Sequence, residues 1–123
     1  MSEEAPVTIR HSAILLTIAQ RYPGVTNALE LYEATRGAWI VGRRREKAEY
    51  ARAVFQGVVQ EVYRIHCWHP AGTLHYETRP RSDFMDERRW EFHGKVAEEP
   101  ERSEYLGKYV GKGTQNPVRY VNI

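Results

Sequence analysis

The chain has 123 residues, of which 41% are hydrophobic and 28% are charged, and its net charge at pH 7 is +2. This length suits one domain that can bury a core without cross-links, and the composition excludes a disordered chain. The small net charge excludes a protein coated with basic residues for non-specific DNA binding, so any anion-binding surface must be a local patch. Cys67 is the only cysteine, which excludes an intrachain disulfide and fits a reducing compartment.

The sequence shows no pattern of a signal peptide or a membrane span, so we expect a protein of the cytoplasm. We expect residues 1–6 to form a flexible N-terminus and residues 7–123 to form a single globular domain. Glu3 and Glu4 place negative charge where a signal peptide needs positive charge. The longest apolar run, Ala13 to Ala19, is too short to span a bilayer, so we expect no membrane association.

The first two expected elements are a strand and a helix. His11 to Tyr22 is rich in β-branched and apolar residues and predicts a buried strand, although the pattern also fits a short helix. Asn27 predicts the N-cap of a helix, with Glu30 at the spacing of a capping box. Gly37 is expected to end this helix in a left-handed conformation.

A hairpin is expected over Ala48 to Ile65. Two β-rich runs flank Gln56-Gly57, where glycine suits a two-residue turn. Counting outward from the turn gives the cross-strand pairs Phe55–Val58, Val54–Val59, Arg52–Glu61, Tyr50–Tyr63 and Glu49–Arg64. Both faces then mix apolar and charged side chains, which is typical of a small, strongly curved barrel.

The remaining elements are short. In chain order we expect a turn at Pro70–Gly72, a strand at His75–Arg79, a charged loop at Pro80–Arg88, a half-buried strand at Trp90–Ala97, a helix at Glu101–Tyr109 and a final strand at Val118–Ile123. Strands with one to three short helices predict an α+β fold, built on a small curved, mostly antiparallel β-sheet or barrel.

A basic segment, Leu31 to Lys47, carries the main functional signal. Its guanidinium groups bind phosphate oxygens bidentately, and an indole between them offers a stacking face for a base. We therefore predict that Arg36, Arg43 and Arg44 hold phosphate and that Trp39 stacks a base. The alternative is a solvated basic loop with Trp39 in the core.

A glycine-rich segment, Tyr105 to Asn116, is the second candidate. It lacks the order of residues that defines a Walker phosphate loop, but backbone amides beside Lys108 and Lys112 could form an anion nest. Asn116 has an amide that could read the edge of a base, and Trp68 is a second stacking candidate. The alternative is a flexible surface loop.

The sequence predicts neither a metal site nor a cofactor. His66, Cys67 and His69 are close in sequence, but strand alternation would point His66 and Cys67 to opposite faces. A nucleophilic Cys67–His site is possible on composition alone. No pair of carboxylates forms an acid–base couple, so we expect no catalytic residues.

Two resemblances bear on function. The run LYEATRGAWIVGRRREKAEYARAVFQGVVQEVYRIHCWHPAG, followed by RRWEFHGKVA and YLGKYVGKGTQNPVRYVN, resembles an uncharacterised domain found C-terminal to GIY-YIG nuclease domains in bacterial proteins. It covers about Leu31 to Asn122. GVV and YLG do not supply the nuclease motifs, so the resemblance implies an accessory module of nucleic-acid chemistry without nuclease activity. The hairpin KAEYARAVFQGVVQEVYRI resembles PUA-like domains, including the EVE type, in which a small barrel holds a modified or flipped base.

Together these patterns predict a non-catalytic module that recognises nucleic acid or a nucleotide, and a modified or flipped base is one form that this ligand can take. One rival is a small enzyme acting on a nucleotide or modified base, with His69 or His93 as the acid–base group. A second rival is a protein-interaction module of a bacterial defence or repair system, in which the Arg–Trp cluster binds a partner of nucleic-acid processing.

Overall fold

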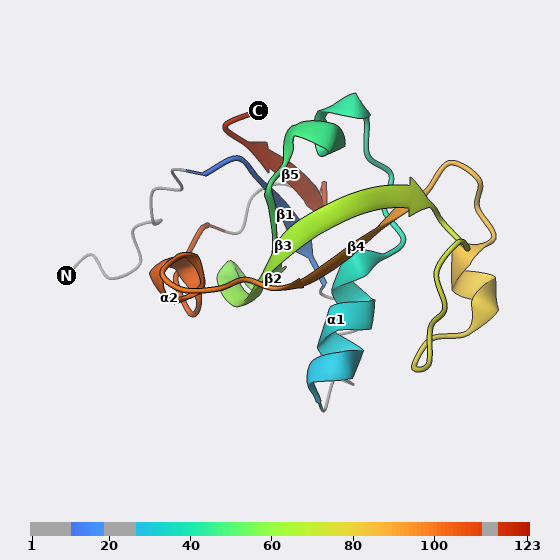
Figure 1. Cartoon of the computed structure of the whole chain (residues 1–123), viewed down its shortest axis with the longest axis horizontal. Helices are drawn as coiled ribbons and strands as arrows, with labels where there is room; N and C mark the ends of the chain where they lie inside the picture. The colour runs from blue at the N-terminus through green and yellow to red at the C-terminus, as the bar shows by residue number, and fades with distance from the viewer. Residues whose placement is uncertain (1–10, 19–26, 112–115) are drawn as a thin grey trace.

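The computed structural model describes residues 11–18, 27–111 and 116–123. Within them, five strands form one open, mostly antiparallel sheet that two α-helices and two short 3-10 helices flank (Figure 1). The strands are β1 (Ala13–Thr17), β2 (Tyr50–Phe55), β3 (Val58–Pro70), β4 (Trp90–Val96) and β5 (Val118–Val121). Their order across the sheet is β4-β3-β2-β1-β5, and only β1 and β2 run parallel. The predicted α+β class is confirmed, but the sheet is not closed into a barrel.

β1 confirms the strand expected after His11. Its residues from Ala13 to Leu16 are all buried, because β2 and β5 flank it and both faces of the sheet are covered. The rest of the predicted strand, from Ala19 to Tyr22, lies outside the described residues, as does the N-terminus predicted to be flexible.

The helix α1 (Ala28–Arg36) begins as predicted. The side chain of Asn27 accepts a hydrogen bond from the backbone N–H of Glu30 at 2.9 Å. Gly37 follows the last helical residue with φ −165°, so the predicted left-handed conformation is wrong. Glycine is required there for a different reason: a Cβ would lie 2.5 Å from the hydroxyl oxygen of Tyr76.

The β2–β3 hairpin turns at Gln56-Gly57, whose φ angles are +52° and +82°. The two pairs nearest the turn are as predicted, but a β-bulge at Gln60 shifts the rest by one residue. The observed pairs are Ala53–Glu61, Arg52–Val62, Ala51–Tyr63 and Tyr50–Arg64. The predicted pairs Arg52–Glu61, Tyr50–Tyr63 and Glu49–Arg64 are therefore wrong. The bulge lets Val59 and Val62 both point into the same core, which strict alternation would forbid.

Each face of the sheet carries its own apolar cluster. On one face, α1 packs over a cluster that includes Ile14, Tyr63 and Phe92. On the other face, the helix α2 (Glu101–Tyr105) inserts Tyr105 into a second cluster with Tyr50. We call the second side the α2 face. The predicted helix over residues 101–109 is confirmed only for its first half.

The loop between β3 and β4 contains no strand, so the prediction for His75–Arg79 is wrong. Its backbone N–H groups are instead taken by buried carboxylates. Glu91 accepts from the N–H groups of Gly72 and Leu74, and Glu33 accepts from those of Glu77 and Thr78. The short helix η3 (Arg81–Phe84) lies in the segment predicted to be a charged loop.

β4 is the outermost strand on one side of the sheet. The Tyr32 hydroxyl donates to the carbonyl oxygen of Gly94 at 2.9 Å and accepts from its N–H at 3.0 Å. Trp39 and Trp90 exchange two backbone hydrogen bonds at the start of the strand, each 2.8 Å long. None of the helices in the described ranges has the length and apolarity needed to cross a bilayer.

Candidate nucleic-acid interface

The basic segment forms a 3-10 helix, η2 (Arg43–Lys47), which leads into β2 and packs against β3 (Figure 1). Arg43, Arg44 and Lys47 are exposed, as the sequence predicted for the two arginines. No Asp or Glu side chain pairs with any of the three among the residues that the structure describes. The guanidinium of Arg44 lies 4.4 Å from the ring centroid of Tyr120 and donates to the main-chain oxygen of Ile123 at 2.7 Å.

Arg45 holds η2 against the sheet. Its guanidinium lies 3.6 Å from the centroid of the Trp90 ring, and its side chain is only 13% exposed. Gly42, just before η2, donates its N–H to the hydroxyl of Tyr120 at 2.9 Å. Contacts to β4 and β5 therefore fix the orientation of η2 and leave its other cations facing outward.

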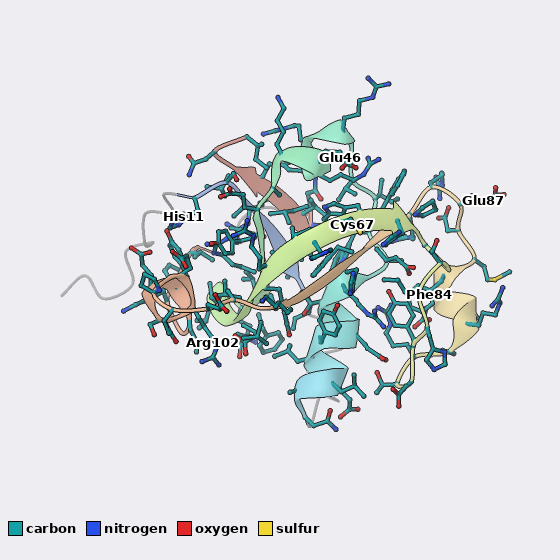
Figure 2. The ribbon with its side chains drawn as sticks, in the orientation of Figure 1. His11, Glu46, Cys67, Phe84, Glu87 and Arg102 are labelled. Carbon is teal, nitrogen blue, oxygen red and sulfur yellow. The ribbon has the colours of Figure 1, made fainter. Side chains whose placement is uncertain are left out.

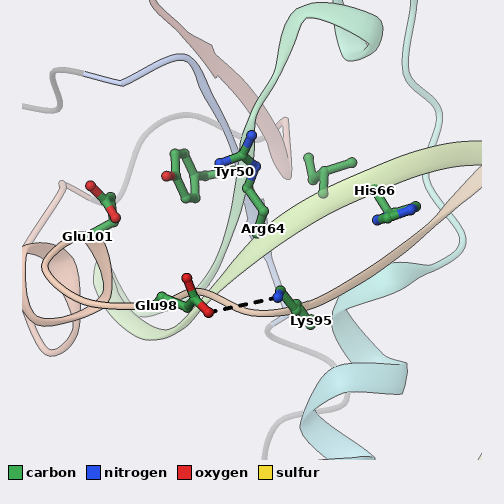
Figure 3. Close-up of a pocket in the computed structure, with 7 residues that line it drawn as sticks. Tyr50, Arg64, His66, Lys95, Glu98 and Glu101 are labelled. Atoms are coloured by element: carbon green, nitrogen blue, oxygen red, sulfur yellow. Dashed lines mark ion pairs between the residues drawn. The ribbon is translucent and has the colours of Figure 1, made fainter.

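A hollow of about 440 Å³ lies next to the middle of β3, on the α2 face (Figure 3). It is lined by Tyr50, Arg64, Ile65, His66, Lys95, Glu98 and Glu101. Lys95 pairs with Glu98 at 3.9 Å, whereas exposed Arg64 has no carboxylate partner in the described part of the chain. The Arg64 guanidinium instead lies 5.3 Å from the ring centroid of Tyr50. We call η2 together with this hollow the η2–β3 face.

Arg36 does not belong to this surface, so its predicted phosphate contact is wrong. It is 8% exposed, and its guanidinium lies 4.2 Å from the ring centroid of Tyr76 and 4.9 Å from that of Tyr32. It also donates to the carbonyl oxygen of His75 and pairs with Glu33 at 3.7 Å. Arg36 therefore anchors the β3–β4 loop to α1.

The two tryptophans differ in burial. Trp68 is 9% exposed and packs edge-on against Phe92, with ring centroids 5.3 Å apart, so its predicted role as a stacking surface is wrong. Trp39 is half-buried, and its indole N–H donates to the carbonyl oxygen of Thr35 at 2.6 Å. Base stacking on the open part of Trp39 stays a prediction.

The glycine-rich segment is separate from the η2–β3 face. The carbonyl oxygen of exposed Lys108 accepts from the N–H of Val59 at 2.9 Å, which places Lys108 at the turn of the hairpin. η2 adjoins the opposite end of β2, about 17 Å away along the strand. Asn116 is exposed and its side-chain oxygen accepts from the N–H of Val118 at 3.0 Å. Lys112 lies outside the described residues.

A second bulge, at His66, changes the placement of the histidines and the cysteine. His66 lines the hollow and Trp68 enters the core, whereas the Cys67 thiol lies 3.1 Å from Nε2 of His69 on the exposed side (Figure 2). The expectation that His66 and Cys67 occupy opposite faces is therefore wrong. The His66 and His93 rings are 5.3 Å apart. Across the described ranges, no three His, Cys, Asp or Glu side chains are grouped so that they could hold a metal ion.

Sequence reasoning missed Arg64 and Tyr50 as site residues. It paired Arg64 with Glu49, and it is the bulge at Gln60 that moves Arg64 opposite Tyr50. No residue type in the sequence marks that bulge. No family model, curated protein or solved structure matches the chain, so the resemblances stated above stay predictions.

Proposed function

We propose that this protein is a non-catalytic nucleic-acid recognition module that binds the phosphate backbone through its η2–β3 face. One observation carries the proposal: Arg43, Arg44, Lys47 and Arg64 are exposed on neighbouring elements, and no Asp or Glu side chain among the described residues pairs with them. Unpaired arginine and lysine side chains are the groups that replace the counterions of a nucleic-acid backbone. Such a local patch is compatible with the small net charge of the chain.

The hollow supports a nucleotide beside the phosphate contacts. Its volume of about 440 Å³ lies within the range of small-molecule sites, and the exposed guanidinium of Arg64 supplies a planar cation at its wall. In its more specific form, the proposal is that the hollow holds a modified or flipped base. A PUA-like relationship, an accessory role beside bacterial nucleic-acid enzymes and a protein partner in that process belong to the same proposal and rest on the resemblances alone. The cytoplasmic location in this proposal rests on the sequence pattern near the N-terminus.

Fluorescence polarisation with labelled single-stranded RNA, single-stranded DNA and duplex DNA tests the proposal. Four phosphate contacts on a single strand predict a slope of about −3 in a plot of log K against log salt. The double variant Arg43→Glu/Arg44→Glu should weaken binding by roughly tenfold or more and reduce the slope by about 1 to 2. Arg81→Glu is the matched control, because Arg81 is equally exposed but lies on η3. Equal affinities for the double variant and the control would refute the proposal.

The same assay separates the rival functions. The contact between Cys67 and His69 is the observation that favours an enzyme, because a thiol beside an imidazole is the arrangement of a nucleophilic site. An enzyme of that kind would convert a nucleotide substrate and lose turnover in Cys67→Ser. A protein-interaction module would bind its partner with little dependence on salt.

A further inference from the structure

Among the arginines that the structure describes, Arg52 is the one that the fold encloses completely. Its side chain projects from β2 on the α2 face and is 0% exposed. All three of its guanidinium nitrogens are buried without a hydrogen-bond partner. The guanidinium lies 4.2 Å from the ring centroid of Tyr105 and 5.2 Å from that of Tyr50. Burial lowers the pKa of Arg52 to about 10, so the group is still positively charged at neutral pH.

No described carboxylate neutralises this charge. The bulge at Gln60 places Val62 opposite Arg52, and Glu61 instead pairs with Arg102 of α2 at 2.9 Å. The residues of the surrounding cluster are apolar or tyrosine. A buried charge without an opposite charge is strongly unfavourable, and aromatic faces offset only part of that cost. An anion bound next to the Arg52 guanidinium would therefore be stabilised by this uncompensated positive charge.

A second arginine increases the positive potential on this face. Arg52 and Arg119 both lie opposite Leu15, one on each neighbouring strand, so the two arginines share one row of the sheet. Within the described ranges, Arg119 donates to two backbone carbonyl oxygens, those of Val110 and Gly111, at 3.2 Å and 2.7 Å. Neutral carbonyl groups satisfy its hydrogen bonds but do not cancel its charge.

Tyr50 and α2 each contact Arg52 and also line the hollow. Tyr50 lines the hollow and faces Arg52, and Glu101 of α2 forms part of the wall. α2 has five residues, and its N-cap residue Pro100 makes no side-chain hydrogen bond, but the carboxylate of Glu99 accepts from the N–H of Ser103 at 2.9 Å. The side-chain contacts that hold it against the rest of the domain include the ion pair between Arg102 and Glu61 and the contacts of Tyr105 with His11 and Arg52. Figure 2 shows Arg102 on this small helix at the side of the sheet.

We propose that Arg52 is the receptor for a terminal phosphate group, which enters from the hollow when α2 lifts from the sheet. This inference rests on the proposed function and specifies its ligand. A phosphate monoester fits better than a phosphodiester within a strand, because only a small molecule or a chain end can reach an enclosed cation. A guanidinium binds two oxygens of such a group at once and matches its negative charge. The shared chemistry is a phosphate monoester, either of a free nucleotide or of an oligonucleotide end.

A titration with inorganic phosphate at constant ionic strength, monitored by NMR, detects binding at Arg52 directly. The side-chain N–H signal of Arg52 should shift with saturation in the wild-type protein, and a nucleoside monophosphate should shift it at lower concentration. An unchanged Arg52 signal would overturn the proposal without any variant. Arg52→Met should remain folded, because replacing an unpaired buried charge by an apolar side chain is often neutral or stabilising. It should lose at least roughly tenfold in phosphate affinity, since the bidentate pair is removed. Retained affinity in Arg52→Met would also overturn the proposal.

Two comparisons complete the test. If a 5′-phosphorylated oligonucleotide binds more tightly than the unphosphorylated strand, and Arg52→Met removes that difference, the source is a chain end. If only the free nucleotide depends on Arg52, the source is the nucleotide. Backbone binding by Arg43 and Arg44 is read from the unphosphorylated strand, so its failure is distinguishable from failure at Arg52.

A separate variant tests whether α2 opens to admit the phosphate. Arg102→Ala removes the ion pair to Glu61 and should raise the open fraction, so that apparent phosphate affinity increases roughly two- to fivefold. Arg88→Ala is the matched control, because it breaks an arginine–carboxylate pair with Asp86 in the β3–β4 loop. Unchanged or weaker binding in Arg102→Ala would refute opening through α2.

Discussion

At the scale of single residues, Gly37 shows how a position can be fixed by space rather than by backbone conformation. A Cβ there would lie 2.5 Å from the Tyr76 hydroxyl oxygen, 3.0 Å from Cβ of Glu91 and 3.3 Å from the Phe84 ring. Gly37→Ala should therefore destabilise the domain by about 1–3 kcal/mol, because the segments that meet at this point must move apart. Urea unfolding measures the change.

Gly42 provides the control for that prediction. It is also a glycine beside the basic segment, but a Cβ there meets nothing within 4 Å and its φ of −91° suits any residue. Gly42→Ala should change the free energy of unfolding by less than about 0.5 kcal/mol. Equal losses at Gly37 and Gly42 would contradict the packing argument.

At the scale of elements, the β3–β4 loop depends on the carboxylate of Glu33. Burial alone would raise the pKa of Glu33, but hydrogen bonds from Thr78 and Glu77 and the charge of Arg36 outweigh it and lower the pKa below its ordinary value of 4.5. A lowered folded-state pKa means that the unfolded chain binds more protons near that pH. The stabilisation is therefore fully present above about pH 4.5 and is lost as the pH falls below it.

Glu33→Gln tests that dependence. The variant should lose about 1–3 kcal/mol at pH 7, because an amide cannot accept all the hydrogen bonds of the carboxylate. Its stability should also fall less steeply than that of the wild-type protein below pH 4.5, as measured by urea unfolding across pH. Glu77→Gln is the control, because Glu77 contributes its backbone N–H to Glu33 while its own side chain is exposed. Parallel acid profiles for the wild-type protein and Glu33→Gln would count against this role.

The same scale shows what could be predicted from the sequence. The helix cap at Asn27 and the turn at Gln56-Gly57 depend on local residue chemistry, and both were predicted correctly. The bulge at Gln60 was missed because it results from burying Val59 and Val62 on one face, which is a tertiary effect. The predicted surface role of Arg36 failed for the same reason, because its aromatic neighbour Tyr76 is distant in sequence.

At the scale of the whole molecule, stability should be distributed unevenly between the sheet and α2. Ile14 and Leu16 of β1 are 0% exposed and lie between two strands, whereas α2 has five residues and packs on one face only. In native-state hydrogen exchange, β1 amides should exchange only by global unfolding. α2 amides should exchange through local opening at a lower free energy and with little dependence on denaturant. Equal exchange free energies in both elements would contradict this distribution and the proposed lifting of α2.

The hydroxyl of Tyr32 has a consequence for how copies of this protein meet. An outermost strand exposes unpaired N–H and C=O groups, to which a strand of another molecule can add. At Gly94, in the middle of β4, Tyr32 occupies both groups with one hydroxyl. The Trp39–Trp90 bridge covers the beginning of the same strand. The Tyr32 hydroxyl and this bridge therefore occupy two positions of the β4 edge at which a strand of another molecule could pair. One hydroxyl group of α1 thus helps to limit aggregation through this edge.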